Sequence, residues 1–256
     1  IKHLYNDAES EWILLDRGSP EESVNINKLF GVKPNDVRFA GNGDRLLFVR
    51  TDDTVRRINI DEQTLSRPLA NNVDTFTTFE EKTVLFTTKP DDKQQRTVSY
   101  SSIDESAPVA IATYPADGKP LFASMGTYFN QRYLATVYDT TLIIQRGSLP
   151  TKDDKGSLKA YAAQIIPEGA SNLTNGRNSR FFAVQLPDGY AVYDLELKKY
   201  DKTTWANPTD RTRSVQWLDD YMIWSDIGGE LRTYEFDGAN QQIIMPVADG
   251  FAAAVS

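Results

Sequence analysis

Asp36 to Asp61 reads DVRFAGNGDRLLFVRTDDTVRRINID, and this stretch decides the fold. It contains a short apolar strand, a turn of Gly, Asn and Asp, a second apolar strand, an Asp turn and a third strand. Gly, Asn and Asp tolerate the positive φ angles of tight hairpins, so the pattern predicts consecutive antiparallel strands. The same pattern returns at Asn172 to Leu195, NLTNGRNSRFFAVQLPDGYAVYDL.

The unit recurs along the chain at intervals of roughly 40 to 50 residues, which is the period of a four-stranded propeller blade. The inner strand of each unit is expected to begin near one of six positions: Asp36, Asp74, Lys119, Ala170, Arg213 and Gly250. The second strands are nearly continuous apolar runs, such as Thr83 to Thr88 and Arg180 to Leu186, and are typical of strands buried on both faces. The outermost strands are more polar, as exposed blade edges should be.

The two ends of the chain are expected to share one blade. Residues 251–256 (FAAAVS) read as an inner strand, and residues 1–6, 11–16 and 23–29 read as three strands without an inner one. We therefore predict an all-β fold: a single β-propeller domain over residues 1–256, closed by its terminal strands. The count is six four-stranded blades, or seven if strands are missing from either end.

Composition excludes several classes of function. The chain has 256 residues, a net charge of −8 and scattered Lys and Arg, so we expect no nucleic-acid partner. Cysteine is absent, which removes thiol catalysis and disulfides. No apolar run reaches the roughly 18 to 20 residues of a membrane helix. The chain begins at Ile1 and ends in a strand-like pattern, so we expect it to be part of something longer, whose other segments carry any signal or anchor.

The units resemble the blades of WD40-like and TolB-like bacterial propellers. They are most similar to the propeller that follows the PEGA domain in bacterial membrane-anchored surface proteins. The resemblance is carried by Glu11 to Phe30, Asn35 to Asp61 and Asp188 to Leu195. It implies a non-catalytic, extracytoplasmic or cell-surface module, and it brings no catalytic residue with it.

The chain departs from both patterns. Ile60-Asp61 and Tyr193-Asp194 stand where WD40 blades end in Trp-Asp, and Gly41 to Asp44 replaces the Ser-Pro-Asp-Gly turn of TolB-like blades.

Catalytic and metal-binding patterns are weak. His3 is the single histidine, so a site built on several histidines is excluded. The four Asp-Asp pairs fall at hairpin turns, where Asp is favoured by the backbone, and none forms an ordered calcium loop. These pairs begin at Asp52, Asp91, Asp153 and Asp219. We expect no cofactor and no metal. A calcium-assisted hydrolase or a glycosidase is the alternative, since ligands from several blades are distant in sequence.

The residual functional signal is a group of aromatic and arginine residues. Aromatic side chains are favoured at protein interfaces and sugar-binding surfaces, and they also pack blade against blade. Arginines near the inner strands can receive an anionic group or pair with nearby Asp. The candidate binding residues are Trp205, Trp217, Tyr221, Trp224, Arg38 and Arg213. The expected function is a binding module for a protein or glycan at a bacterial cell surface, with an architectural spacer as a further alternative.

Overall fold

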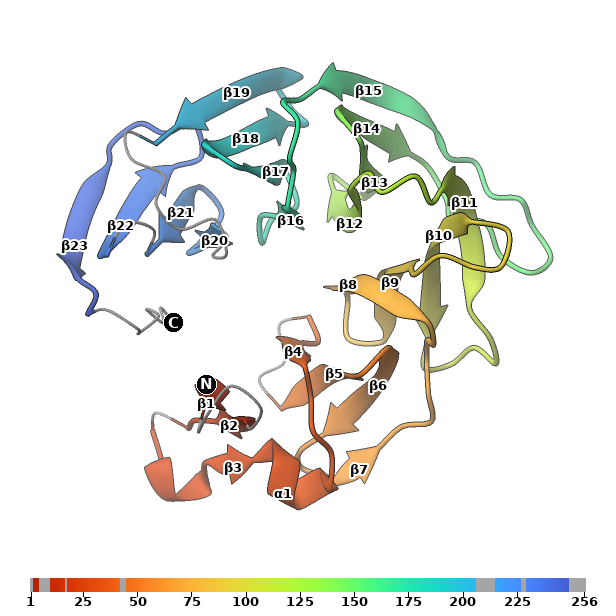
Figure 1. The fold of residues 1–256 in the computed structure, drawn as a ribbon, viewed down its shortest axis with the longest axis vertical. Coiled ribbons are helices and arrows are strands. Elements are labelled where there is room, and N and C mark those ends of the chain that lie inside the picture. Colours follow the sequence, from red (N-terminus) through yellow and green to blue (C-terminus); the bar gives the residue numbers. More distant parts are fainter. Residues whose placement is uncertain are drawn as a thin grey trace. The chain divides into compact units, whose positions relative to one another are not determined.

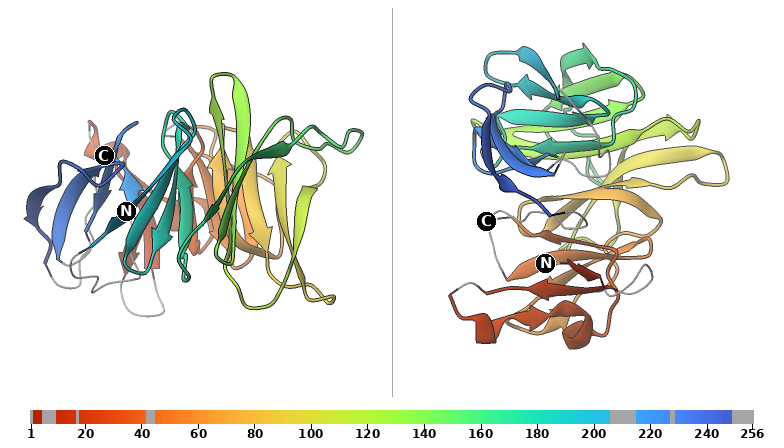
Figure 2. Two further views of the ribbon diagram at one scale, coloured as in Figure 1. Left: turned by 90° about the horizontal axis from the view of Figure 1, so that it is seen from above. Right: turned by 60° about the vertical axis from the view of Figure 1, so that its left-hand side comes forward.

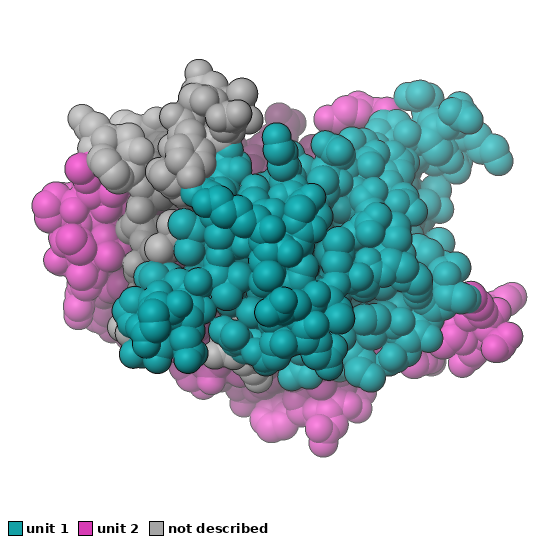
Figure 3. Space-filling view, turned by 90° about the horizontal axis from the view of Figure 1, so that it is seen from below, with its two compact units in different colours: residues 1–115 teal, residues 116–256 magenta. Residues whose placement is uncertain are grey.

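The computed structural model describes residues 2–4, 10–16, 18–41, 45–205, 215–226 and 229–248, and of residues 2–4 it describes the backbone alone. The chain divides into two compact units, Ile1–Pro115 (unit 1) and Ala116–Ser256 (unit 2), coloured separately in Figure 3. A single domain over residues 1–256 stays a prediction.

Unit 1 contains one three-stranded sheet and two four-stranded antiparallel sheets, labelled in Figure 1. The three-stranded sheet consists of β1 (Lys2–Leu4), β2 (Ser10–Leu14) and β3 (Val24–Asn25), with the short helices η1 (Pro20–Glu22) and α1 (Ile26–Phe30) beside β3. The next sheet consists of β4 (Asp36–Phe39), β5 (Leu46–Thr51), β6 (Thr54–Asn59) and β7 (Thr64–Leu65). The last consists of β8 (Val73–Phe79), β9 (Thr83–Thr88), β10 (Gln95–Ser102) and β11 (Val109–Pro115).

Unit 2 contains three four-stranded antiparallel sheets, in which each strand pairs with its sequence neighbour. The first consists of β12 (Leu121–Tyr128), β13 (Gln131–Tyr138), β14 (Thr141–Arg146) and β15 (Lys159–Ile165). The second consists of β16 (Asn172–Asn175), β17 (Phe181–Leu186), β18 (Gly189–Asp194) and β19 (Lys199–Thr204). The third consists of β20 (Gln216–Trp217), β21 (Met222–Ser225), β22 (Glu230–Glu235) and β23 (Gln242–Pro246). Figure 2 shows their hairpins from two further directions.

These sheets are the blades of a β-propeller, so the predicted all-β fold is confirmed. The predicted count of six blades, or seven, is wrong: the propeller has five four-stranded blades. The sheet β1–β3 has three strands in the described part of the chain. The strand expected at 251–256 to complete it lies outside the described residues.

The expected strand at 23–29 is replaced after two residues by helix α1. Asn25 caps this helix, because its side chain accepts a hydrogen bond from the backbone N–H of Lys28 at 3.0 Å. Gly31 ends the helix with a φ of 63°, which glycine adopts without strain. The apolar alternation that suggests a strand instead places Ile26 in a buried cluster with Leu47 of β5.

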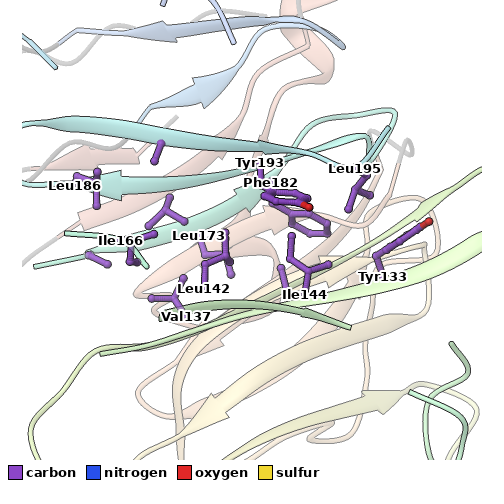
Figure 4. Packing of buried hydrophobic residues seen from close by; sticks show 14 residues of the cluster. Tyr133, Val137, Leu142, Ile144, Ile166, Leu173, Phe182, Leu186, Tyr193 and Leu195 are labelled. Atoms are coloured by element: carbon purple, nitrogen blue, oxygen red, sulfur yellow. The ribbon is translucent and has the colours of Figure 1, made fainter. Parts of the chain in front are cut away.

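The main cores of unit 2 lie between its neighbouring blades. All twelve residues of β17 and β18 are buried, as expected for strands covered on both faces. Phe182 and Val184 of β17 face the blade β12–β15, as Figure 4 shows for Phe182. Phe181 and Ala183 alternate with them and face the blade β20–β23. One strand thus contributes to two cores, and burial of its large side chains stabilises the fold by roughly 2 kcal/mol each.

No helix among the described residues is long and apolar enough to cross a membrane.

Candidate functional site

The predicted aromatic residues are mostly part of the packing between blades. Trp217 stacks on Phe181 with the ring centroids 5.9 Å apart, and its indole N–H donates to the Thr174 hydroxyl at 3.2 Å. Trp205 is half-buried, and its ring centroid lies 6.3 Å from that of Tyr190. Trp224 in β21 is also half-buried. Trp205 and Trp217 pack against the buried cluster around Phe181, so blade packing accounts for these two rings, while a binding role for the three tryptophans stays a prediction.

Tyr221 is the exception, with 48% of its surface exposed. It lies in the turn between β20 and β21, and its ring meets that of Phe181 edge to face, with the ring centroids 5.7 Å apart. A binding role for Tyr221 therefore has the exposed surface that it requires.

Of the two predicted arginines, the structure describes Arg38 alone. Arg38 lies in β4 of unit 1, where it forms an ion pair with Asp36 at 3.1 Å and lies 4.9 Å above the ring of Phe76. Arg38 thus connects the inner strands β4 and β8 of two neighbouring blades. Its charge is compensated by Asp36, which lies two residues earlier in the same strand. Arg213 lies outside the described residues.

Tyr221 belongs to a larger surface at one end of unit 2. Antiparallel strands reverse direction at each turn, so the turns β12–β13, β16–β17, β18–β19, β20–β21 and β22–β23 fall at the same end of their blades. Three exposed apolar side chains project from these turns, one from each blade. They are Phe129 (76% exposed), Leu197 (63%) and Tyr221 (48%), and we call them the tip surface.

The tip surface is connected by a continuous set of contacts across the three blades. Tyr128, whose ring centroid lies 4.5 Å from that of Phe129, donates its hydroxyl hydrogen to Glu196 at 2.9 Å. Glu196 precedes Leu197 and forms an ion pair of 2.6 Å with Arg180.

Arg180 carries the connection onward to Tyr221. Its guanidinium carbon lies 4.9 Å from the ring centre of Phe181, which in turn contacts Tyr221. Phe236, from the turn β22–β23, stacks on the same Phe181 ring at 4.3 Å. The exposed tips therefore rest on a shared ordered base and do not belong to three independent loops.

Arg180 and Asp194 form the centre of this base. Arg180 donates from Nε to Asp194 Oδ1 at 2.9 Å and from Nη2 to Oδ2 at 2.6 Å. The other acceptor capacity of Asp194 is used by the backbone N–H groups of Glu196 and Leu197, at 2.8 and 3.2 Å. Asp194 thereby holds the turn that presents Leu197.

Local electrostatics shifts the pKa values of Arg180, Asp194 and Tyr128. Burial acts to raise the pKa of Asp194, but the Arg180 guanidinium and the two backbone N–H groups outweigh it and lower the pKa. The hydrogen bond from Arg180 to Asp194 raises the pKa of Arg180. Burial, together with the bond to Glu196, raises the pKa of the Tyr128 hydroxyl to about 12. Arg180 and Asp194 are therefore both charged at neutral pH and form a fixed ionic brace.

Phe129 has a backbone conformation that is costly for its type. Its φ is 45° and that of Asn130 is 56°, as in the hairpin turns that favour Asn and Gly at both central positions. A bulky residue in this left-handed region costs roughly 1–2 kcal/mol. The chain thus holds a strained phenylalanine whose side chain is three-quarters exposed.

The metal alternative has no support among the residues that the structure describes. Within them, no group of three or more His, Asp or Glu side chains is placed to hold an ion. The side chain of His3 in β1 lies outside the described part.

The candidate residues predicted from the sequence include Trp217 and Tyr221 and leave out Arg180, Phe129 and Leu197. The signal for Phe129 was an aromatic residue in a hairpin turn, Phe129-Asn130, where Gly, Asn or Asp is expected. No comparable signal marked Leu197, since an apolar residue in a turn is exposed only if the turn points outward.

No family model matches the chain, and no curated protein matches it either. Solved structures do match. A crystal structure of a Lactobacillus plantarum protein is 15% identical over 96% of this chain and 80% of its own length, with a TM-score of 0.59. The WD40 domain of SCAP from fission yeast is 7% identical, with a TM-score of 0.54, and the match spans 85% of this chain and 56% of that one. KlAtg21, solved with the coiled-coil of AgAtg16, is 12% identical over 88% and 73%, with a TM-score of 0.56.

These identities establish a shared fold and nothing finer. The chain is a β-propeller with WD40-like blades. Its structural neighbours belong to WD40 and related propellers, and they do not show the finer likeness to the PEGA-associated propeller.

Proposed function

We propose that this propeller is a non-catalytic module that binds a protein partner through the tip surface of unit 2. The observation that supports the proposal most directly is the set Phe129, Leu197 and Tyr221, exposed on three neighbouring blades over one ionic brace. Apolar anchors held on a preorganised base lose little conformational freedom on binding, which favours affinity.

Conformational strain at Phe129 adds to this argument. Asn or Gly in its place relieves the strain and also removes an exposed aromatic ring, so stability alone selects against phenylalanine there. Strained residues that are retained cluster at functional sites. A binding role for the Phe129 side chain supplies the reason to retain it.

A protein partner suits the tip surface better than a glycan. Of its three side chains only Tyr221 carries a polar group, whereas sugar sites combine aromatic faces with several hydrogen-bonding side chains. KlAtg21, one of the structural neighbours, is solved in complex with a coiled-coil, and this supports a protein partner by analogy of fold alone.

The proposal includes a location at the surface of a bacterial cell. Its support is the resemblance of Glu11 to Phe30 and Asn35 to Asp61 to the propeller that follows the PEGA domain in surface proteins.

Differential capture tests the proposal. The wild type, the variant F129N/L197S/Y221S and the control L15S/L29S/F39S are immobilised and exposed to extract from the source cells. The control removes three exposed apolar side chains from unit 1. A protein retained by the wild type and the control and lost from the tip variant is then purified and titrated against all three by calorimetry.

The expected result is binding at one site, weakened at least about tenfold in the tip variant, which is 1.4 kcal/mol. Equal binding by the tip variant contradicts the proposal. A glycan array read with the same three proteins separates a glycan partner from a protein partner. Turnover of a substrate by the wild type that survives the tip substitutions would favour the propeller enzyme instead.

A further inference from the structure

The turns around Tyr221 carry four carboxylates, which we call the acidic rim: Asp219, Asp220, Glu235 and Asp237. The two turns that hold them are joined by a hydrogen bond from the backbone N–H of Phe236 to the carbonyl of Tyr221, at 2.9 Å. The acidic rim therefore borders the exposed ring of Tyr221 within one blade.

Hydrogen bonds within the turns fix two members of the acidic rim, Asp219 and Asp237. Asp219 accepts from the backbone N–H groups of Tyr221 and Met222, both at 2.7 Å. Asp237 accepts from the backbone N–H of Ala239 at 3.0 Å. These bonds hold the two carboxylates in place.

No Lys or Arg nitrogen lies within 4.0 Å of any rim carboxylate in the part of the chain that the structure describes. Other acidic residues of unit 2 are paired: Asp194 with Arg180, Asp188 with Lys202, and Asp201 with Lys199. The ammonium group of Lys199 forms its ion pair with Asp201, at 2.8 Å, and its electrostatic interaction with Asp237 acts over a longer distance. Negative charge is thus concentrated beside one exposed anchor of the tip surface.

We propose that the partner contributes a positively charged segment, in which Lys or Arg lies beside an apolar side chain. The cation takes its place among the rim carboxylates, against the face of Tyr221, while the apolar side chain contacts Leu197 and Phe129. This inference rests on the proposed function, since it uses the same surface. Arg suits the position better than Lys, because its planar guanidinium both stacks on an aromatic face and bonds carboxylates at two points.

Charge complementarity is what selects this partner over a purely apolar one. Four like charges on neighbouring turns repel one another, and an incoming cation relieves that repulsion as well as forming its own attraction. Such attraction at an exposed site is screened by salt, so binding should weaken as ionic strength rises.

The test is selection from a random-peptide phage library on three immobilised proteins. They are the wild type, the rim variant D219N/D220N/E235Q/D237N and the control D52N/D53N/D91N/D92N. Amide side chains keep the oxygen acceptors that the turns need, at the rim and at Asp91 alike. The control changes the net charge of the protein by the same amount, at turns of unit 1.

The inference expects peptides enriched on the wild type and the control to carry Lys or Arg next to an apolar residue. Synthetic versions of these peptides should bind the rim variant at least about tenfold more weakly and lose affinity at high salt. Enrichment of neutral or acidic peptides, equal binding by the rim variant, or no enrichment at all overturns the inference. If basic peptides bind but ignore F129N/L197S/Y221S, the proposed function fails. If the selected peptides are not basic but lose affinity for F129N/L197S/Y221S, the proposed function stands and only the inference of a positively charged partner is wrong.

Discussion

Arg180 and Asp194 form a two-point ion pair, with Nε 2.9 Å from Oδ1 and Nη2 2.6 Å from Oδ2, in which the side chains are only 15% and 2% exposed. The pair joins the start of β17 to the end of β18 and, through Glu196, reaches Tyr128 in the neighbouring blade. It is therefore both a stabilising contact within one blade and the support for Phe129 and Leu197.

Breaking this pair should destabilise the protein strongly. Asp194→Ala leaves a largely buried guanidinium without its main partner and removes the acceptor of two backbone N–H groups, so we expect a loss of about 3 kcal/mol or more. Arg180→Lys keeps the charge but loses the two-point geometry and should cost less. Urea unfolding measures both. Asp104→Ala is the control, because its pair with Lys82 is exposed and should be worth less than about 1 kcal/mol. Equal losses for Asp194→Ala and Asp104→Ala contradict the proposed role.

Acid should remove the contribution of Asp194 in a predictable direction. The pKa of Asp194 is lower in the folded protein than in the unfolded chain, where it lies near ~3.9. The stabilisation is thus fully present above the unfolded pKa and is lost as the pH falls through the folded pKa. The free energy of unfolding of the wild type should therefore approach that of Asp194→Asn in acid, as urea titrations at several pH values will show. A difference between the two proteins that stays constant with pH excludes this linkage.

The contrast between what the sequence predicted and what it missed has a physical basis. Strand β17 was predictable, because an unbroken apolar run between two turns has no alternative but burial on both faces. Helix α1 was missed, since the side-chain cap of Asn25 decides against the strand and a cap is weak in sequence beside an alternating apolar pattern.

The candidate site was predictable only in part. Tyr221 stood out in the sequence by its residue type. The pairing of Arg180 with Glu196 and of Glu196 with Tyr128 depends on how blades meet, which no local pattern encodes. Exposure of Phe129 and Leu197 likewise depends on the direction of their turns. A binding role for Trp205, Trp224 and Arg38 stays a prediction.

Replacing Phe129 by Asn should separate stability from binding. Asn adopts a φ of 45° more readily than Phe, so Phe129→Asn should raise the free energy of unfolding by about 1 kcal/mol. The same change removes the most exposed ring of the tip surface, so the variant should bind the captured partner more weakly than the wild type does. Phe39→Asn, at an exposed site in β4, provides the matched loss of an aromatic side chain. If Phe129→Asn gains stability and keeps its full affinity for the partner, the Phe129 side chain has no role in binding.

Calcium should leave the thermal stability unchanged. The described residues contain no cluster of acidic side chains placed to hold an ion, so we expect the same midpoint of unfolding with calcium and with EDTA. An ion that binds the folded state alone would add about 2.7 kcal/mol at a hundredfold excess over its dissociation constant. A clear rise of the unfolding midpoint with calcium would therefore favour the alternative of a calcium-assisted hydrolase.

Gly126 should be required where the inner strands β12 and β16 meet. A Cβ at this position would lie 2.4 Å from the Cβ and 2.5 Å from the Oγ of Ser179, closer than van der Waals contact permits. Gly126→Ala should therefore cost roughly 1–3 kcal/mol, measured by thermal or urea unfolding. Ser179 has a φ of 57°, which glycine adopts freely, so Ser179→Gly removes the clashing atoms without straining the turn. The double variant should recover most of the loss, and the coupling energy from the double-mutant cycle should be clearly favourable. Ser179→Gly also removes the hydrogen bond that the Asn175 amide donates to the Ser179 hydroxyl, so the single Ser179→Gly variant is the reference for the rescue. If Ser179→Gly fails to rescue Gly126→Ala, the close approach of these two residues is not what makes glycine necessary.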